Sequence, residues 1–347
     1  MTRMHAAFIT GHGGNDVVLL GDRTKPVRKA GEVMVRMRAG GLNRVDLYMR
    51  DSGAGITHSL PQTLGLDGVG TIEDADDNET RLKKGQRVVL HPALGCGRCA
   101  FCLRGEHVLC LTSKYLGEHV DGTLSEFVCL PAENAFPAPE VLDDIEAAAL
   151  SVAPLTAWRM VFTKAAVKPW ETVLIFGVGG AVSLSALQFV KMIGARAIVT
   201  SRDDAKLGRA MALGADATIN GVREDIARRA LALTDGRGVD VVIENVGEAV
   251  WPHAMKSLVR GGRIVLCGAT SGDAPSADLR RLFIRQLQVM GSTHGTFEEF
   301  RQLLAVTGQG GFRPVIDSRY AFGEIHAALD RLDASAQFGK IGIDMPR

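Results

Sequence analysis

Four of the six cysteines lie in one short stretch, at Cys96, Cys99, Cys102 and Cys110, with the spacing C-x2-C-x2-C-x7-C. Four thiolates at this spacing can hold one tetrahedral zinc ion. A zinc with four protein ligands has no open position for water or substrate, so this site is expected to stabilise a lobe and do no chemistry. Two alternatives remain. One is an iron–sulfur cluster, although the long last gap differs from the short-gap run of bacterial ferredoxins, and the other is four unrelated reduced thiols.

The other two cysteines lie in a different sequence context. Cys129 in "LSEFVCLP" and Cys267 in "GGRIVLCGA" belong to strand-like apolar runs with turn residues nearby. Both are expected to be buried as small hydrophobic side chains.

A second stretch that could do chemistry is "IFGVGGAV", in which Gly177, Gly179 and Gly180 follow an apolar run and precede an amphipathic one. Glycines at a strand-to-helix turn let the backbone approach a pyrophosphate, and the N-terminus of the following helix favours its negative charge. The pattern G-x-G-x-x-G lacks its third glycine, because Val182 stands there. An ordinary tight turn is the alternative, but the position between a strand and a helix favours dinucleotide binding.

The residues after the next strand bear on which dinucleotide would bind. An acidic residue there would accept a hydrogen bond from the 2′-hydroxyl of NAD, but this chain reads "VTSRDDAK", with Ser201 and Arg202 in those places. Arg202 can pair with a 2′-phosphate, and Lys206 adds a second positive charge one helical turn later. NADP(H) is therefore favoured over NAD(H). The alternative is that Arg202 is a solvated loop residue and that Asp203 supplies the carboxylate for NAD.

The elements around these motifs change in character along the chain. The first 130 or so residues are short apolar runs closed by Gly, Pro, Asn and Asp, which indicates a β-rich lobe. After Pro139 helical and strand-like runs alternate, and one long helical run covers 141–167 with a break expected at Pro154. Repeated strand–helix units predict an α/β fold with a doubly wound parallel sheet. A chain of 347 residues is expected to form two domains.

Charge and hydropathy exclude several classes of partner. The 40 Lys and Arg nearly balance the 39 Asp and Glu, so we expect neither nucleic acid nor an anionic membrane surface as a partner. The start of the chain has no apolar run of signal-peptide length, and no later run reaches the length of a membrane span. We expect a cytoplasmic protein with a small-molecule substrate.

Taken together, these features resemble the medium-chain dehydrogenase/reductase superfamily over essentially the whole chain, and its zinc alcohol dehydrogenases carry a matching four-cysteine loop. The resemblance implies a GroES-like catalytic domain at 1–151 with a zinc loop at 91–111. It also implies a Rossmann domain at 152–290, a C-terminal segment at 291–347 that returns to the catalytic domain, and a homodimer.

The same resemblance locates a second, catalytic zinc, whose ligands are absent here. Matched motif by motif, the family's first Cys falls on Asn43, its His–Glu pair on Leu66–Asp67, and its last Cys on Val152. Leu and Val cannot coordinate zinc, so a catalytic zinc in the usual place is not expected.

The residues around Asn43 point to a particular branch of the superfamily. "LNRVDLYMRDSG" resembles the N-P-V-D-x-Y-x-R-x-G pattern of the quinone oxidoreductase, or zeta-crystallin, branch, which uses NADPH and no catalytic metal. Without a Lewis acid, a quinone or enone is the easier hydride acceptor because its π system spreads the developing charge. Asn43 and Tyr48 are the candidate donors to the acceptor oxygen, and Thr156 matches a family threonine near the nicotinamide. Each residue also has a purely structural alternative. Asn43 can brace a turn, Tyr48 can be a packed aromatic side chain, and Thr156 can hydrogen-bond to its own backbone.

Two other functions stay open. The first is an alcohol dehydrogenase whose catalytic zinc sits on unfamiliar ligands, drawn from His58, Asp67, His91 and His119. The second is a low-turnover NADPH-binding sensor or structural protein.

Overall fold

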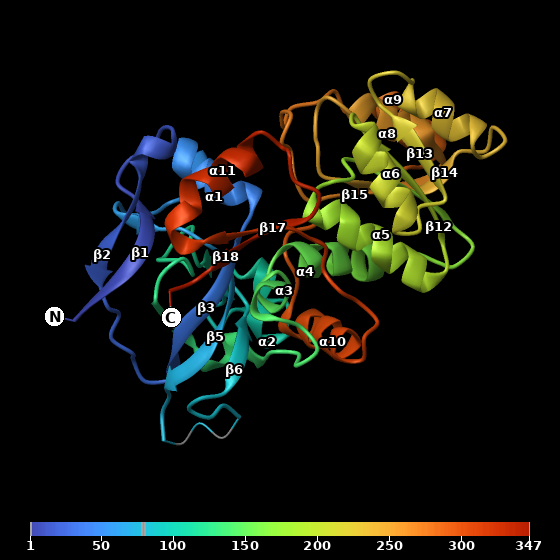
Figure 1. Cartoon of the computed structure of the whole chain (residues 1–347). Helices are drawn as coiled ribbons and strands as arrows, with labels where there is room; N and C mark the ends of the chain where they lie inside the picture. The colour runs from blue at the N-terminus through green and yellow to red at the C-terminus, as the bar shows by residue number, and fades with distance from the viewer. Residues whose placement is uncertain (1, 78, 80, 347) are drawn as a thin grey trace. The chain divides into compact units, whose positions relative to one another are not determined.

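A computed structural model describes residues 2–77, 79 and 81–346, and the chain folds into two compact units (Figure 1). The central unit covers Thr156–His294, and the terminal unit combines the residues up to Leu155 with those from Gly295 onward. These divisions lie four residues after the expected boundaries at 151 and 290.

The central unit is built on a six-stranded sheet in which every neighbouring pair is parallel. The strands, in order across the sheet, are β13 (Ala217–Asn220), β12 (Arg196–Ser201), β11 (Thr172–Ile175), β14 (Val239–Glu244), β15 (Leu258–Leu266) and β16 (Gln288–Gly291). The chain runs outward from β11 in one direction and then from β14 in the other. This order confirms the doubly wound parallel sheet, whose switch point for ligand binding lies at the carboxyl ends of β11 and β14.

Helices connect these strands and shield the sheet, which explains the apolar runs. All residues of β11 and β14 are buried, as expected for parallel strands covered on both faces. The helices of this unit are α5 (Ala181–Ile193), α6 (Asp204–Ala212), α7 (Ile226–Ala232), α8 (Trp251–Ser257), α9 (Leu279–Arg285) and the π-helix η5 (Arg159–Lys164). Gly194 ends α5 in the left-handed conformation, with φ 86°, as a helix C-terminal glycine does.

The long helical run expected at 141–167 is broken earlier than predicted. It forms α3 (Asp144–Ala148), then α4 (Ala153–Trp158), which continues into η5. Pro154 lies in the first turn of α4 instead of at the break, because a first-turn residue has no intrahelical partner for its N–H.

The terminal unit is β-rich, and nearly all its strand pairs are antiparallel. One sheet has the order β10 (Ala135–Pro137), β6 (Arg87–Leu90), β5 (Asp67–Asp74), β3 (Glu32–Leu42), β18 (Lys340–Asp344) and β17 (Ile316–Ala321), with β9 (Phe127–Pro131) also paired to β3. The others are β2 (Val18–Thr24), β1 (Arg3–Ile9) and β4 (Gln62–Thr63), and the pair β7 (Ala93–Leu94) and β8 (Lys114–Tyr115). Because β18 pairs with β3, the end of the chain completes the sheet that its beginning starts.

Short helices fill in around these sheets. They are α1 (Arg44–Asp51), α2 (Ala100–Leu103), α10 (Phe297–Gly308), α11 (Ile325–Asp333), and the 3-10 turns η1 (Asn15–Val17), η2 (Gly53–Gly55), η3 (His107–Leu109), η4 (Ala132–Asn134) and η6 (Phe322–Glu324). The core of the unit joins strand residues such as Val35, Leu90 and Ile343 to Leu329 of α11.

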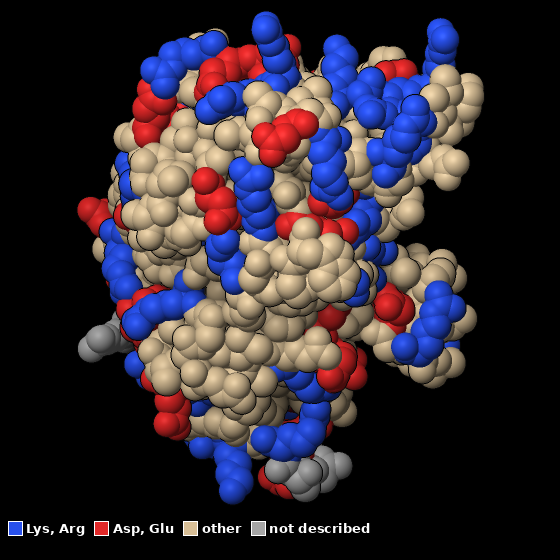
Figure 2. All heavy atoms as spheres, turned by 90° about the vertical axis from the view of Figure 1, so that its right-hand side faces the viewer, with Lys and Arg blue, Asp and Glu red and all other residues tan. Residues whose placement is uncertain are grey.

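Basic and acidic side chains intermix over the surface seen in Figure 2, and the basic ones gather over its upper part. Across the described residues, no helix is long and apolar enough to cross a membrane.

Candidate functional site

The four cysteines of the predicted zinc loop converge. Their Sγ atoms all lie within 4.8 Å of one another, with Cys96 and Cys102 4.0 Å apart and Cys99 and Cys102 3.6 Å apart. A tetrahedral zinc with Zn–S bonds of about 2.3 Å separates its sulfurs by about 3.8 Å, so the donor set fits this ion.

The backbone of the loop supports thiolates at these positions. The N–H groups of Cys96 and Cys99 donate to the sulfurs of Cys110 and Cys96, at 3.3 and 3.4 Å. Hydrogen bonds from the backbone of Cys102 and Leu111 lower the pKa of the Cys99 thiol to about 6. The loop therefore offers preformed partners to a metal-bound sulfur, as structural zinc loops require.

The glycine-rich turn lies at the carboxyl end of β11, beside the switch point of the sheet. Gly177 and Gly179 have φ of 68° and 126°, a region that favours glycine. A Cβ on Gly177 would meet Val246 Cγ2 at 3.0 Å, so a side chain there would be both strained and crowded. Gly180 is the N-cap of α5, a helix of 13 residues whose N-terminus suits a pyrophosphate.

The missing third glycine has a structural explanation. Val182 is only half-buried, so it does not lie where helix and strand approach most closely. The next residue, Ser183, is fully buried, donates to the Phe176 carbonyl at 2.7 Å and accepts from Asn245 Nδ2 at 2.9 Å. Ser183 thus ties the helix to the strand without a glycine.

The residues after β12 occupy distinct roles. Asp203 is the N-cap of α6, and its Oδ1 accepts from the N–H groups of Ala205 and Lys206 at 2.8 and 3.4 Å. Arg202 is exposed, and its guanidinium contacts no carboxylate or carbonyl in the part of the chain that the structure describes. The charge of Arg202 is therefore available to a ligand, whereas the carboxylate of Asp203 is engaged in capping α6.

The three positions that match the family's catalytic ligands surround Asp67. Leu66 and Asp67 are buried, and burial raises the pKa of Asp67, while Lys340 and the Asn43 amide lower it. Lys340 Nζ forms an ion pair with Asp67 Oδ2 and donates to the Leu42 carbonyl at 2.7 Å and to Asn43 Oδ1 at 2.9 Å. The positive charge beside Asp67 is thus the buried ammonium of Lys340, and its three N–H donors are all used.

These contacts give Asn43 a bracing role. Asn43 is the N-cap of α1, and its N–H donates to Asp46 Oδ2 at 2.7 Å. Asp46 is fully buried and also accepts from Gly65 N at 3.0 Å, so it fixes the loop. Burial raises the pKa of Asp46 to about 6.

Tyr48 lies on α1 with its side chain half-buried. Its hydroxyl has no hydrogen-bond partner among the described residues. Burial raises the pKa of Tyr48, so the phenol keeps its proton at neutral pH. Tyr48 therefore presents an unused donor.

Thr156 lies on α4 at the first residue of the central unit and is buried, with 7% of its surface exposed. Cys129 and Cys267 are both only partly buried, which differs from the full burial expected from the sequence, and burial raises the pKa of the Cys267 thiol to about 12. Neither cysteine is set up as a nucleophile.

The ligands considered for an unfamiliar zinc site do not converge. His91 is fully buried among aromatic rings, with centroids 4.9 Å from Phe297 and 5.0 Å from His107, and its Nε2 lies 2.9 Å from the Gly295 carbonyl. Asp67 is paired with Lys340. Across the described residues, the four cysteines form the one group of three or more His, Cys, Asp or Glu that could hold a metal.

Sequence reasoning missed two residues, Lys340 beside Asn43 and Glu118 near Asp46. Lys340 begins a fully buried stretch of β18, and a lysine within an apolar strand was the signal that could have found it. Glu118 gave no separate signal. Its carboxylate lies 3.9 Å from His119 Nδ1, with 15% of the side chain exposed. Burial, and then the charge of Asp46, raise its pKa to about 7.

Glu118 is expected to make stability depend on pH. Its folded pKa of about 7 lies above the ordinary 4.5, so the folded state binds the proton more tightly and stability falls as pH rises from 4.5 through 7. Replacing Glu118 by glutamine should remove this decline. The free energy of unfolding of E118Q, measured relative to wild type, should therefore increase by about 2–3 kcal/mol between pH 4.5 and pH 8. Urea unfolding at both pH values measures it, with the exposed Glu133→Gln as control. Parallel pH profiles for E118Q and wild type would contradict the assignment.

Comparison with known proteins identifies the family. Two family models match, the alcohol dehydrogenase GroES-like domain at residues 29–140 and the zinc-binding dehydrogenase at residues 181–308. The alcohol dehydrogenase of Geobacillus stearothermophilus is 30% identical over 319 residues, which cover 91% of this chain and 92% of that protein. The chain belongs to the zinc-type alcohol dehydrogenase family of medium-chain dehydrogenases/reductases.

Other members of this zinc-type alcohol dehydrogenase family are similar over the same length. The NAD-dependent alcohol dehydrogenase of Saccharolobus solfataricus is 30% identical over 329 residues, 91% of this chain and 93% of that protein. A crystal structure of an NAD-dependent alcohol dehydrogenase has a TM-score of 0.95 at 36% identity, covering 99% of this chain and 100% of that one. The cobalt- and zinc-bound alcohol dehydrogenase of Pyrobaculum aerophilum has a TM-score of 0.89 at 29% identity, covering 99% of this chain and 100% of that one.

Membership makes this chain an oxidoreductase of the alcohol dehydrogenase type, with a nicotinamide cofactor and zinc. The four-cysteine loop fits a structural zinc, and the turn after β11 fits the cofactor's pyrophosphate. The residues at Asn43, Leu66 and Val152 do not fit the catalytic zinc.

Proposed function

We propose that this chain is an NADPH-dependent reductase of quinones or α,β-unsaturated carbonyls that works without a catalytic metal. The observation that carries the proposal is the replacement of the catalytic ligands by Asn43, Leu66 and Val152, around an Asp67 that pairs with Lys340. An apolar side chain cannot ligate zinc, and Lys340 has no donor left to polarise a substrate oxygen.

The choice of acceptor follows from what these residues can supply. NADPH, when bound, provides the hydride. A plain carbonyl needs strong stabilisation of the charge that develops on its oxygen, whereas a conjugated acceptor spreads that charge and needs mainly orientation and one hydrogen bond. Tyr48 supplies that hydrogen bond and can deliver a proton, and Asn43 positions the start of α1. Thr156 is proposed to lie near the nicotinamide, as the family resemblance implies.

The preference for NADPH rests on the loop after β12. Arg202 has no acidic partner among the described residues, and Asp203 is engaged as the N-cap of α6. A free guanidinium favours a 2′-phosphate, with Ser201 and Lys206 beside it. The relative from Saccharolobus solfataricus is named as NAD-dependent, so the proposed preference is a difference between the two chains.

The test is NADPH oxidation with a panel of quinones and enones, run beside primary and secondary alcohols with NADP⁺. The proposal predicts turnover of the conjugated acceptors. It also predicts that Tyr48→Phe lowers kcat by about 10- to 100-fold, the value of one charge-assisted hydrogen bond, with little change in NADPH affinity. Turnover of alcohols alone would overturn the proposal in favour of an alcohol dehydrogenase, and NADPH binding without any turnover would favour a sensor.

We also propose an assembly and a cellular location. A homodimer follows from the family resemblance and is supported by β16, the edge strand, beside exposed Phe283 and Val289, with 71% and 41% of their surfaces accessible. A reducing compartment such as the cytoplasm is proposed because a four-thiolate zinc site needs reduced cysteines.

A further inference from the structure

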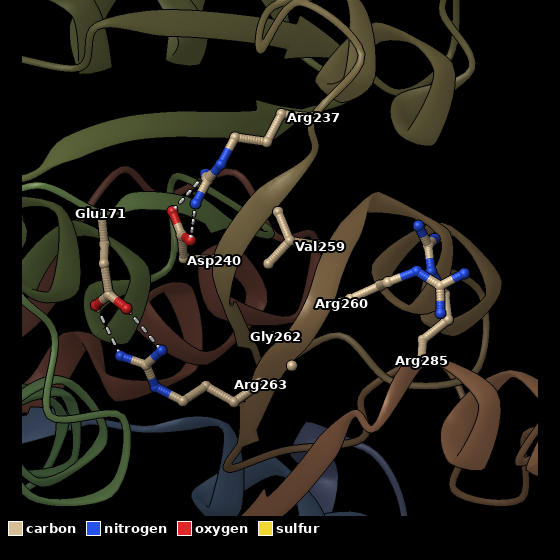
Figure 3. A pocket seen from close by; sticks show the side chains of 9 residues that line it. Glu171, Arg237, Asp240, Val259, Arg260, Gly262, Arg263 and Arg285 are labelled. Carbon is tan, nitrogen blue, oxygen red and sulfur yellow. Dashed lines mark hydrogen bonds and ion pairs between the residues drawn. The ribbon is translucent and has the colours of Figure 1, made fainter.

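A pocket of about 500 Å³ lies in the central unit, away from the glycine-rich turn. Figure 3 shows its lining, which comes from the start of β14, the first half of β15, the end of α9 and the residue before β11. The lining residues are Glu171, Arg237, Asp240, Val259, Arg260, Gly261, Gly262, Arg263 and Arg285. Four arginines and two acids leave this pocket with two positive charges in excess.

Two of the arginines are neutralised by close pairs. Arg237 donates to both oxygens of Asp240 at 2.6 and 2.9 Å. Arg263 donates to both oxygens of Glu171 at 2.7 and 2.8 Å, and to the Ala165 carbonyl at 2.6 Å. In these two bidentate pairs, both carboxylates of the pocket are neutralised by an arginine.

The other two arginines share the opposite side of the pocket, where Figure 3 shows the guanidinium groups of Arg260 and Arg285 close together. Arg260 donates to the Ile284 carbonyl at 3.0 Å, so one side of it caps the end of α9. The Arg285 guanidinium meets no carboxylate or carbonyl among the described residues. The positive charges of Arg281 and Arg260 repel that of Arg285. Burial and these two charges, in that order, lower the pKa of Arg285.

The nearby Arg281 does not relieve this repulsion. It donates to the carbonyls of Met255 and Lys256, at 2.9 and 3.2 Å, at the end of α8. Structural roles therefore account for Arg260 and Arg281, whereas Arg285 is a partly buried cation beside like charges with no counter-ion of its own. A bound anion would relieve this repulsion between like charges.

The anion is not the nicotinamide cofactor. The pocket lies at the amino ends of the strands, since Asp240 is the second residue of β14 and its Oδ2 accepts from Thr172 N at the start of β11, 2.9 Å away. The glycine-rich turn lies at the carboxyl ends of the same strands. A strand of four to six residues separates the two edges by roughly 13–20 Å.

We propose that Arg260 and Arg285 form a binding site for a small phosphate-bearing anion, separate from the cofactor site. Two guanidinium groups on one wall suit a dianionic phosphate, which can accept forked hydrogen bonds from each. The pocket volume admits a phosphate ester as well as inorganic phosphate. The anion would neutralise the two excess charges and raise the stability of the central unit through binding to the folded state.

The test measures thermal unfolding and binding calorimetry of the zinc-loaded protein with inorganic phosphate and with glycerol phosphate, at constant ionic strength set by chloride. NADPH at saturation removes any contribution from the cofactor site. We expect phosphate to raise the Tm of wild type, and Arg285→Gln to weaken phosphate binding at least tenfold. Arg228→Gln, which removes an exposed arginine of α7 outside the pocket, should bind phosphate as wild type does.

Three outcomes would overturn the proposal. Chloride alone could give the same Tm shift, or Arg285→Gln could bind phosphate as tightly as Arg228→Gln. Alternatively, sedimentation velocity could show that Arg285→Gln dissociates a dimer while phosphate has no effect, which would assign the charge to a carboxylate of a second copy. A stronger response to glycerol phosphate than to inorganic phosphate would support an ester as the ligand. None of these readouts depends on turnover, so they are independent of the proposed reaction.

Discussion

Replacing Lys340 by methionine should destabilise the protein by about 3–5 kcal/mol, the usual cost of leaving one member of a buried ion pair alone. Lys340 and Asp67 have 3% and 0% of their side chains exposed. The substitution would leave the Asp67 carboxylate without its cation and would also remove the donors to Leu42 and Asn43. Urea unfolding of the zinc-loaded protein at pH 7 measures the change.

A second variant separates the ion pair from simple packing. Lys340→Met combined with Asp67→Leu removes both charges and should recover most of the lost stability, because the remaining site is apolar. The loss for the single variant should shrink toward pH 5, since burial already raises the pKa of Asp67 and removal of Lys340 raises it further. Lys84→Met, at an exposed lysine, is the control. A K340M variant within 0.5 kcal/mol of that control would contradict the role of the buried pair.

Changing Arg202 to aspartate should reverse the cofactor preference. The variant loses an attraction for the 2′-phosphate of NADPH and gains a repulsion, and its new carboxylate can accept from the 2′-hydroxyl of NADH. We expect the ratio of kcat/KM for NADPH to that for NADH to fall by about 100- to 1,000-fold. Low salt enlarges the effect because Arg202 is exposed.

The same measurement decides between Arg202 and Asp203. Arg209→Asp, which makes the same charge change about two helical turns further along, in α6, is the control and should alter the ratio much less. An unchanged ratio in Arg202→Asp, together with a preference of wild type for NADH, would restore the alternative in which Asp203 binds the ribose.

Local sequence patterns predicted the parts of this structure that local interactions determine. The cysteine spacing predicted a cluster, and the run from β11 through Gly177 to α5 predicted a strand, a turn and a helix, because each depends on residues close in the chain. The break assigned to Pro154 was wrong for a local reason as well, since proline is tolerated in a first helical turn. The parallel sheet followed from the alternation of strands and helices.

The contacts around Asp67 could not be read in this way. Lys340 and Asn43 are 297 residues apart, and their hydrogen bond exists only because β18 returns to pair with β3. The same holds for Glu118, whose raised pKa depends on burial and on the charge of Asp46, which is far away in the sequence, in the first turn of α1. Sequence matching showed which ligands were missing, whereas only the fold shows that a buried ammonium holds the charge of Asp67.

We propose that one zinc, held by the four-cysteine loop, is the whole metal content of this chain, whereas a similar alcohol dehydrogenase structure is described as cobalt- and zinc-bound. Elemental analysis after dialysis against a mild chelator tests it most directly. We expect about one zinc per chain in wild type and none in Cys102→Ser. About two zinc ions in wild type and one in Cys102→Ser would contradict it, because a second site would then exist that Asn43, Leu66 and Val152 cannot form.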